Sequence, residues 1–128
     1  KANEDLNVSN VDLAPTIAHA MGIYQENKEG FSFWRGSSLL SRIKRDRVII
    51  NLSTNDVRIW LDEGFAIIYK DMRFVFNLKT GPELYNIAKD SKQRNNLWPR
   101  LGNDKRRFYL DIIAQDRHLT RIFNLFTP

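Results

Sequence analysis

The sequence predicts an α+β fold, in which an antiparallel sheet of about four strands packs against a long C-terminal helix and is preceded by a short helix and an irregular loop. Between residues 47 and 87, short apolar runs rich in β-branched and aromatic residues alternate with polar, turn-sized segments. Turns of this length join antiparallel neighbours. Apolar residues then recur at helical spacing toward the C-terminus, where a helix can cover the apolar face of the sheet.

The composition is that of one ordinary globular domain, which we expect to span residues 1–128. The chain has 128 residues, of which 42% are hydrophobic and 27% charged, as in folded soluble domains. No apolar run approaches the ~20 residues that a membrane-spanning helix needs. The absence of cysteine excludes disulfides, thiolate metal ligands and a cysteine nucleophile.

A short helix is predicted near the N-terminus, followed by a loop, so that residues 9–41 form a helix-and-loop segment. One apolar stripe at i, i+4, i+7 and i+8 spacing is formed by Leu13, Ile17, Ala20 and Met21. Asp12 can cap the start of this helix, and Gly22 can end it in a left-handed conformation. From residue 24 to residue 41 the glycines and serines predict an irregular loop, pinned by its aromatic residues.

Residues 47–128 are predicted to form the sheet and the helix that covers it. The runs that favour strands are 47–53, 56–62, 65–70, 73–78 and 83–87. Alternation places Phe74, Phe76 and Leu78 on one face, as a sheet covered on one side requires. The covering helix is predicted from a C-terminal apolar stripe that comprises Phe108, Ile112, Leu119, Ile122 and Phe126, with Ile113 and Phe123 beside it.

The positive charge of the chain points weakly to a polyanionic partner. The net charge is +5 and the pI is about 9.7, but the cations are dispersed, and their two local groups at residues 42–47 and 105–107 are interrupted or preceded by aspartates. No aromatic RNA-binding motif, glycine-rich clamp or zinc-finger spacing accompanies them. We therefore expect solvated faces and no nucleic-acid partner. A basic module for anionic polymers stays open as an alternative.

No catalytic residue and no metal site is predicted in this chain. His19 and His118 have no visible partner with which either could act as a base. Asp62 and Glu63 are adjacent in a turn, where side chains diverge, and the two serines after Gly36 lack the strand context of a nucleophile elbow. The sequence also contains no phosphate-binding glycine loop and no metalloprotease motif.

Two stretches nevertheless resemble a known enzyme family. SNVDLAPTIAHAMGI (9–23), followed by WRGSSLL (34–40), resembles the SxxDLxPTxxxxxGI and GxSLL patterns in the C-terminal half of the sulfatase and alkaline-phosphatase superfamily. ELYNIAKDSKQRNNL (83–97) is similar to a later pattern of sulfatases and related phosphoglycerol or phosphoethanolamine transferases, ELYDLxxDPxExxNL. The two patterns occur in the family's order and together cover residues 9–97.

The second stretch departs from the family pattern without losing its spacing. Asn86 stands where the family has Asp, Ser91 where it has Pro, and Gln93 or Arg94 where it has an acid. We expect the stretch to be a structural clasp that begins with a strand entering the core. Asp90 would cap a turn, and residues 96–97 would fasten the following chain back onto the sheet.

The resemblance implies that this chain is the C-terminal portion of a larger enzyme. In the family, an N-terminal domain carries the nucleophile and the ligands of a divalent metal such as calcium, magnesium or manganese, and no such motif precedes Ser9 here. The helix and loop of residues 9–41 would link to that domain, which is the expected partner, and self-association through an exposed sheet or loop face would follow in its absence. Arg35 could hold a sulfate or phosphate oxygen.

The family likeness leaves the activity of the parent open between two classes. The leading expectation is a non-catalytic subdomain of a sulfatase that hydrolyses sulfate esters. The alternative is the equivalent part of a membrane-attached phosphoglycerol or phosphoethanolamine transferase. Either parent suggests an extracytoplasmic location, and this chain itself would hold no cofactor.

Overall fold

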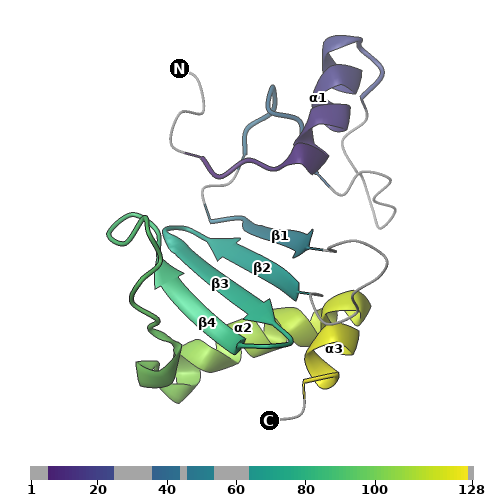
Figure 1. Cartoon of the computed structure of the whole chain (residues 1–128). Helices are drawn as coiled ribbons and strands as arrows, with labels where there is room; N and C mark the ends of the chain where they lie inside the picture. Colours follow the sequence, from purple (N-terminus) through teal and green to yellow (C-terminus); the bar gives the residue numbers. More distant parts are fainter. Residues whose placement is uncertain (1–5, 25–35, 44–45, 54–63, 127–128) are drawn as a thin grey trace. The chain divides into compact units, whose positions relative to one another are not determined.

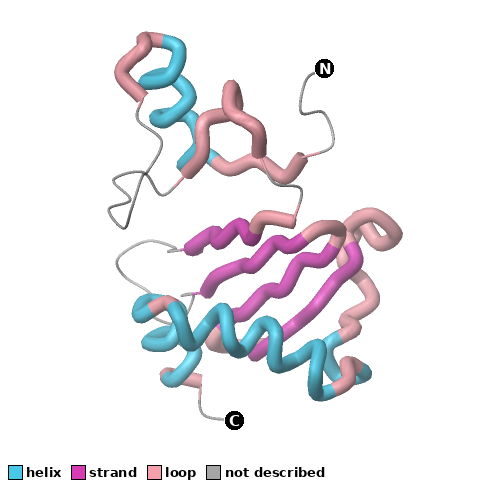
Figure 2. The backbone as a smooth tube through the Cα atoms, turned by 180° about the vertical axis from the view of Figure 1, so that it is seen from behind, coloured by secondary structure: helices cyan, strands magenta, loops and turns pink. Residues whose placement is uncertain are grey.

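The computed structural model describes residues 6–24, 36–43, 46–53 and 64–126. The chain divides into two compact units, Lys1–Ile49 and Ile50–Pro128, here called unit 1 and unit 2. Figures 1 and 2 show unit 1 as a short helix with loops, and unit 2 as a sheet with helices on one face. No helix within the described ranges combines the length and the apolar character that crossing a membrane requires.

Unit 1 contains the predicted N-terminal helix. A short 3-10 turn, η1 (Asn10–Asp12), leads into α1 (Leu13–Ala20). Gly22 ends the helix at a φ of +73°, and its backbone N–H donates to the carbonyl of His19, as predicted for a glycine cap. The expected capping role of Asp12 was wrong: its side chain makes no cap for α1, because other segments of unit 1 occupy its carboxylate.

The sheet has four strands in the order in which they occur in the chain. They are β1 (Val48–Ser53), β2 (Gly64–Tyr69), β3 (Met72–Asn77) and β4 (Gly81–Asn86). Strands β2, β3 and β4 pair antiparallel, so the predicted α+β class and sheet of about four strands are confirmed. The run predicted at 56–62 lies outside the described residues.

The register of the strands gathers apolar side chains on one face of the sheet. Ile67 of β2 faces Phe74 of β3, which in turn faces Leu84 of β4. A second row runs from Phe65 to Phe76. All five side chains are almost fully buried, and burying a side chain of this size contributes roughly 1.5–3 kcal/mol. A slip of one residue would turn both rows to the opposite face.

The prediction of one long C-terminal helix was wrong, because two helices cover the sheet. α2 (Asn103–Gln115) and α3 (Arg117–Asn124) are separated at Asp116, whose backbone is extended. The Asp116 carboxylate accepts hydrogen bonds from the backbone N–H groups of His118 and Leu119. A side chain that caps a new helix start in this way ends one helix and begins the next.

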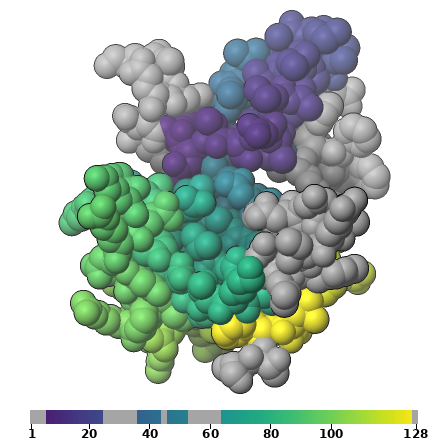
Figure 3. All heavy atoms as spheres, in the orientation of Figure 1, coloured from purple at the N-terminus to yellow at the C-terminus, as the bar shows by residue number. Residues whose placement is uncertain are grey.

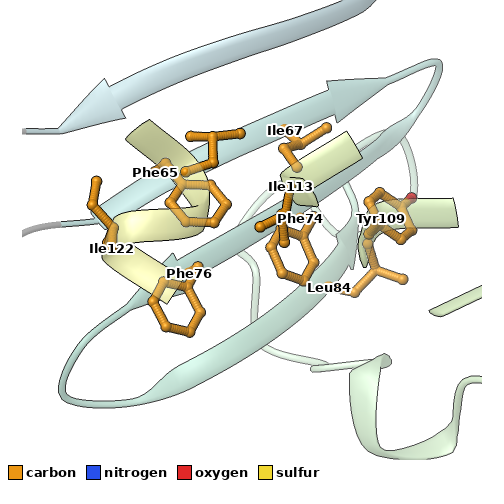
Figure 4. Packing of buried hydrophobic residues seen from close by; sticks show 9 residues of the cluster. Phe65, Ile67, Phe74, Phe76, Leu84, Tyr109, Ile113 and Ile122 are labelled. Carbon is orange, nitrogen blue, oxygen red and sulfur yellow. The ribbon is translucent and has the colours of Figure 1, made fainter. Parts of the chain in front are cut away.

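The helices complete a single apolar core in unit 2. Tyr109 and Ile113 from α2 and Leu119 and Ile122 from α3 pack against the two rows of the sheet. Figure 4 shows Tyr109, Ile113 and Ile122 in this core. The predicted stripe was correct in α3 and one position off in α2, where Phe108 is exposed and Tyr109 buried. Phe74 stacks on Tyr109 with ring centroids 5.3 Å apart.

Candidate functional site

The side chain of Asp12 is the centre of a buried polar network in unit 1. It is fully buried, and the Arg47 guanidinium donates from Nη2 to both of its oxygens, at 2.9 Å to Oδ1 and 2.8 Å to Oδ2. The backbone N–H of Ser37 donates to Oδ1 at 2.9 Å, and that of Ser9 donates to Oδ2 at 2.8 Å. One carboxylate thus ties three segments of unit 1 together.

This network holds Asp12 in its ionised form. Burial is the largest single influence and opposes ionisation, but the hydrogen bonds from Arg47, Ser37 and Ser9 together outweigh it and lower the pKa of Asp12 below its ordinary value of 3.8. The charge of Asp12 is therefore matched by a cation and by two amides. A carboxylate engaged in this way has no free oxygen with which to take a proton from a substrate.

Two further side chains of α1 hold the loop that follows. The Thr16 hydroxyl donates to the Asp12 carbonyl and accepts from the backbone N–H of Leu39, at 2.9 Å in the latter case. His19 Nδ1 lies 2.9 Å from the hydroxyl of Ser38. Residues 36–43 have no regular secondary structure, as predicted, and these contacts define their path.

Gly36 explains why the loop can approach the helix start so closely. A Cβ at this position would collide with the backbone of Val11 and Asp12, so only glycine fits there. Hydrogen bonds therefore join the motif at 9–23 to the described part of the motif at 34–40. Asp12, Thr16 and His19 bind the chain just after Gly36. Ser38 is fully buried and bonded to His19, which is a structural arrangement and not an exposed nucleophile.

The predicted clasp is confirmed in unit 2. Asp90 accepts hydrogen bonds from the backbone N–H groups of Arg94, at 3.1 Å, and Asn95, at 2.9 Å. These two bonds form the turn that was expected. They also stabilise the charged carboxylate and lower the pKa of Asp90, with the Asn95 amide as the larger cause.

The end of the clasp binds the outer edge of β4. Asn96 Oδ1 accepts the backbone N–H of Leu84 at 3.0 Å, and the backbone N–H of Leu97 donates to the carbonyl of Leu84 at 2.8 Å. Asn96 Oδ1 also accepts the N–H of Trp98 at 2.9 Å. The clasp thereby provides hydrogen-bond partners for the backbone N–H and carbonyl of Leu84. On an open edge strand these groups could pair with another chain.

Among the described residues, the others considered from the sequence show no catalytic constellation. Arg35, Asp62 and Glu63 lie outside the described residues. His118 is exposed near the start of α3. Within the described ranges, no three His, Cys, Asp or Glu side chains gather as a metal would require.

Sequence reasoning missed two parts of the Asp12 network. Arg47 had been assigned to a group of solvated cations, although its guanidinium is mostly buried, with 16% of the side chain exposed. His19 had no visible partner, because Ser38 is 19 residues away in the chain. The motif spacing hinted at a helix and a loop that belong together, but it does not identify their hydrogen bonds.

An apolar surface remains uncovered on α1. Leu13, Ile17 and Met21, spaced four residues apart, are 56%, 60% and 67% exposed. Val8, Val11, Ile23 and Leu40 are also exposed large hydrophobic residues of unit 1. The apolar residues of α1 therefore lie on one side of the helix, as predicted, but within the described residues their side chains are exposed. The helix buries Pro15 and Ala18 instead.

A solved structure has a similar fold, whereas neither a scan against protein-family models nor a search of curated proteins found a match. The chain is similar to the structure of BT4656 in complex with its substrate D-glucosamine-2-N,6-O-disulfate, with a TM-score of 0.56 and 17% sequence identity. The match covers 91% of this chain and 24% of BT4656. At this identity the likeness shows a shared fold, and this chain spans about a quarter of the length of that protein.

Proposed function

We propose that this chain is the non-catalytic C-terminal subdomain of a larger sulfatase-superfamily enzyme, which hydrolyses sulfate esters in a domain that precedes it. The observation that carries this proposal is the match of 91% of the chain to a quarter of BT4656, whose substrate is a doubly sulfated amino sugar. The order of the resemblance motifs points to the same superfamily.

The chemistry of the described residues is consistent with a supporting role. The fully buried carboxylate of Asp12 is engaged by Arg47 and by backbone amides. The described residues do not fit a divalent metal, since they offer no cluster of ligands. In this proposal the metal and the nucleophile belong to the preceding domain, where water cleaves the ester to an alcohol and inorganic sulfate.

The exposed face of α1 supplies the surface for that domain. Its stripe of Leu13, Ile17 and Met21 has the spacing of a buried helix face, yet these side chains are more than half exposed. Large apolar side chains that gather in this way are typical of contact surfaces. We propose that this face packs against the catalytic domain of the same protein and that the isolated chain self-associates through it.

Sulfate release tests the proposed function. The protein encoded by the full gene, with everything that precedes Lys1, is incubated with glucosamine-2-N,6-O-disulfate, and free sulfate is measured by ion chromatography. We expect release by the longer protein that EDTA abolishes, and none by the 128-residue chain alone. Turnover by the chain alone that survives repurification would contradict the proposal. Cleavage of phosphatidylglycerol without cleavage of the sulfate ester would favour the transferase alternative.

A further inference from the structure

Most of the chain's excess positive charge comes from one segment of unit 2. Between Lys89 and Arg107 there are seven lysines and arginines and two aspartates, a net charge of +5 that equals the net charge of the whole chain. Apart from the group at 105–107, polar and apolar residues separate these cations in the sequence, so the sequence pattern indicates dispersed charge. The fold gathers the segment along one edge of the unit.

Three structures form this edge in succession: the part of the clasp that follows β4, η3 (Trp98–Arg100) and the N-terminal end of α2. They lie outside β4 in both backbone views (Figures 1 and 2) and at the surface in the space-filling view (Figure 3). We call the six exposed cations of this segment the basic edge: Lys89, Lys92, Arg94, Arg100, Lys105 and Arg107.

The backbone that carries the basic edge is held at two places. Asn96 and Leu97 bind it to Leu84 of β4. Arg106 then joins η3 to α2, because its Nη2 donates to the carbonyls of Trp98, at 3.0 Å, and Pro99, at 2.9 Å. A charged surface on a preformed backbone loses less conformational entropy when it binds a ligand. Arg106 is part of this scaffold and not of the basic edge.

The charges of the basic edge are available to a ligand. In the part of the chain that the structure describes, none of its six cations forms a salt bridge. Asp90, the acid within the clasp, directs both carboxylate oxygens to the backbone amides of Arg94 and Asn95. Asp104 is the other acid of the segment and lies in the first turn of α2, where the helix dipole favours a negative charge.

The surface chemistry argues against a membrane and against a nucleic acid as the polyanionic ligand. None of the exposed large hydrophobic residues lies between residues 89 and 107, so nothing in the described segment would insert into a membrane. Its one aromatic residue, Trp98, is half-buried, lies against Phe74 and carries Arg106 over its ring, which leaves no stacking platform for bases. The remaining lysines and arginines suit a polymer with repeated anionic groups, of which a sulfated polysaccharide is one.

We propose that the basic edge binds a sulfated polysaccharide, so that the enzyme's substrate is a polymer held by this subdomain as well as by the catalytic site. The choice of sulfate as the anion rests on the proposed function. The binding surface itself rests on the charge and the fixed geometry of residues 89–107. Such electrostatic contacts weaken as salt concentration rises.

Binding of the 128-residue chain to heparin tests this inference, with N- and O-desulfated heparin, single-stranded DNA and phosphatidylserine vesicles as comparison ligands. The edge variant carries Lys92→Gln, Arg94→Gln, Lys105→Gln and Arg107→Gln. The control variant carries Arg42→Gln, Lys79→Gln, Arg117→Gln and Arg121→Gln, which remove the same charge from exposed positions elsewhere. Circular dichroism confirms that both variants are folded.

We expect salt-dependent binding to heparin that desulfation abolishes, a loss of affinity of at least about tenfold in the edge variant and less than about threefold in the control. Equal losses in both variants, no binding to heparin, or tighter binding to DNA or to vesicles at the same salt concentration would overturn the inference. Sulfate release by the longer protein together with any of these results would leave the proposed function standing. Edge-dependent binding without sulfate release would reject the proposed function alone.

Discussion

Asp12 is the residue on which the local structure of unit 1 depends most. We predict that Asp12→Asn destabilises this unit by about 3 kcal/mol, because removal of one partner leaves the mostly buried Arg47 guanidinium without a counter-charge. Hydrogen exchange of the α1 amides measures the effect. Asp46→Asn, which changes an exposed carboxylate next to Arg47, is the control and should cost less than about 0.5 kcal/mol.

The difference in stability between the wild type and Asp12→Asn depends on pH. The pKa of Asp12 is lowered in the folded state from 3.8, so the folded form binds the proton less readily than the unfolded form. The stabilisation is therefore complete above about pH 4 and is lost as pH falls through the lowered pKa. The two proteins should converge in strongly acidic solution. An asparagine variant as stable as the wild type at neutral pH would show that the ion pair does not hold unit 1.

The sequence did not predict this network. Asp12 and Gly36 occupy motif positions, but Asp12 was expected only to cap the N-terminal helix. The role of Arg47 could not be predicted, since the sequence places it in a group of cations that otherwise read as solvated. Burial of a charge depends on which segments meet in three dimensions, and one sequence does not contain that information.

At the scale of elements, the clasp protects the outer edge of β4. We predict that Asn96→Ala destabilises unit 2 by about 1–3 kcal/mol, because the part-buried backbone N–H groups of Leu84 and Trp98 both lose their acceptor. Urea unfolding followed by circular dichroism measures this. Asn95→Ala changes an exposed neighbour and should stay within about 0.5 kcal/mol. Equal effects of the two substitutions would contradict the assigned role of the Asn96 side chain.

The order of the elements was predictable, but the break in the C-terminal helix was not. Strands β1 to β4 agree with the predicted runs within about two residues, because alternation and turn chemistry agree there. The predicted apolar stripe keeps helical spacing from Ile112 through Leu119 to Ile122, so periodicity alone suggests one helix. The signal for two helices is Asp116, because aspartate favours the position just before a helix starts.

At the scale of the whole molecule, the two units differ in how far they bury their apolar side chains. Unit 2 buries its apolar rows between the sheet and two helices, whereas the apolar stripe of α1 in unit 1 is exposed. The first arrangement was predictable from sequence patterns, because the strands and helices that pack together lie in the same stretch of chain. Within the described residues the α1 stripe stays exposed, and the proposed catalytic domain would cover it.

Oxidation of the two methionines tests this central claim most directly. Met21 lies on the α1 stripe and is 67% exposed, whereas Met72 of β3 is half-buried and serves as the internal reference. The rate at which dilute hydrogen peroxide converts each to its sulfoxide is followed by mass spectrometry in the 128-residue chain, at a concentration where it is monomeric, and in the longer gene product. We predict that Met21 reacts quickly in the isolated chain and is protected several-fold in the longer protein, relative to Met72. Equal reactivity of Met21 in the two proteins would contradict the claim that α1 packs against a preceding domain.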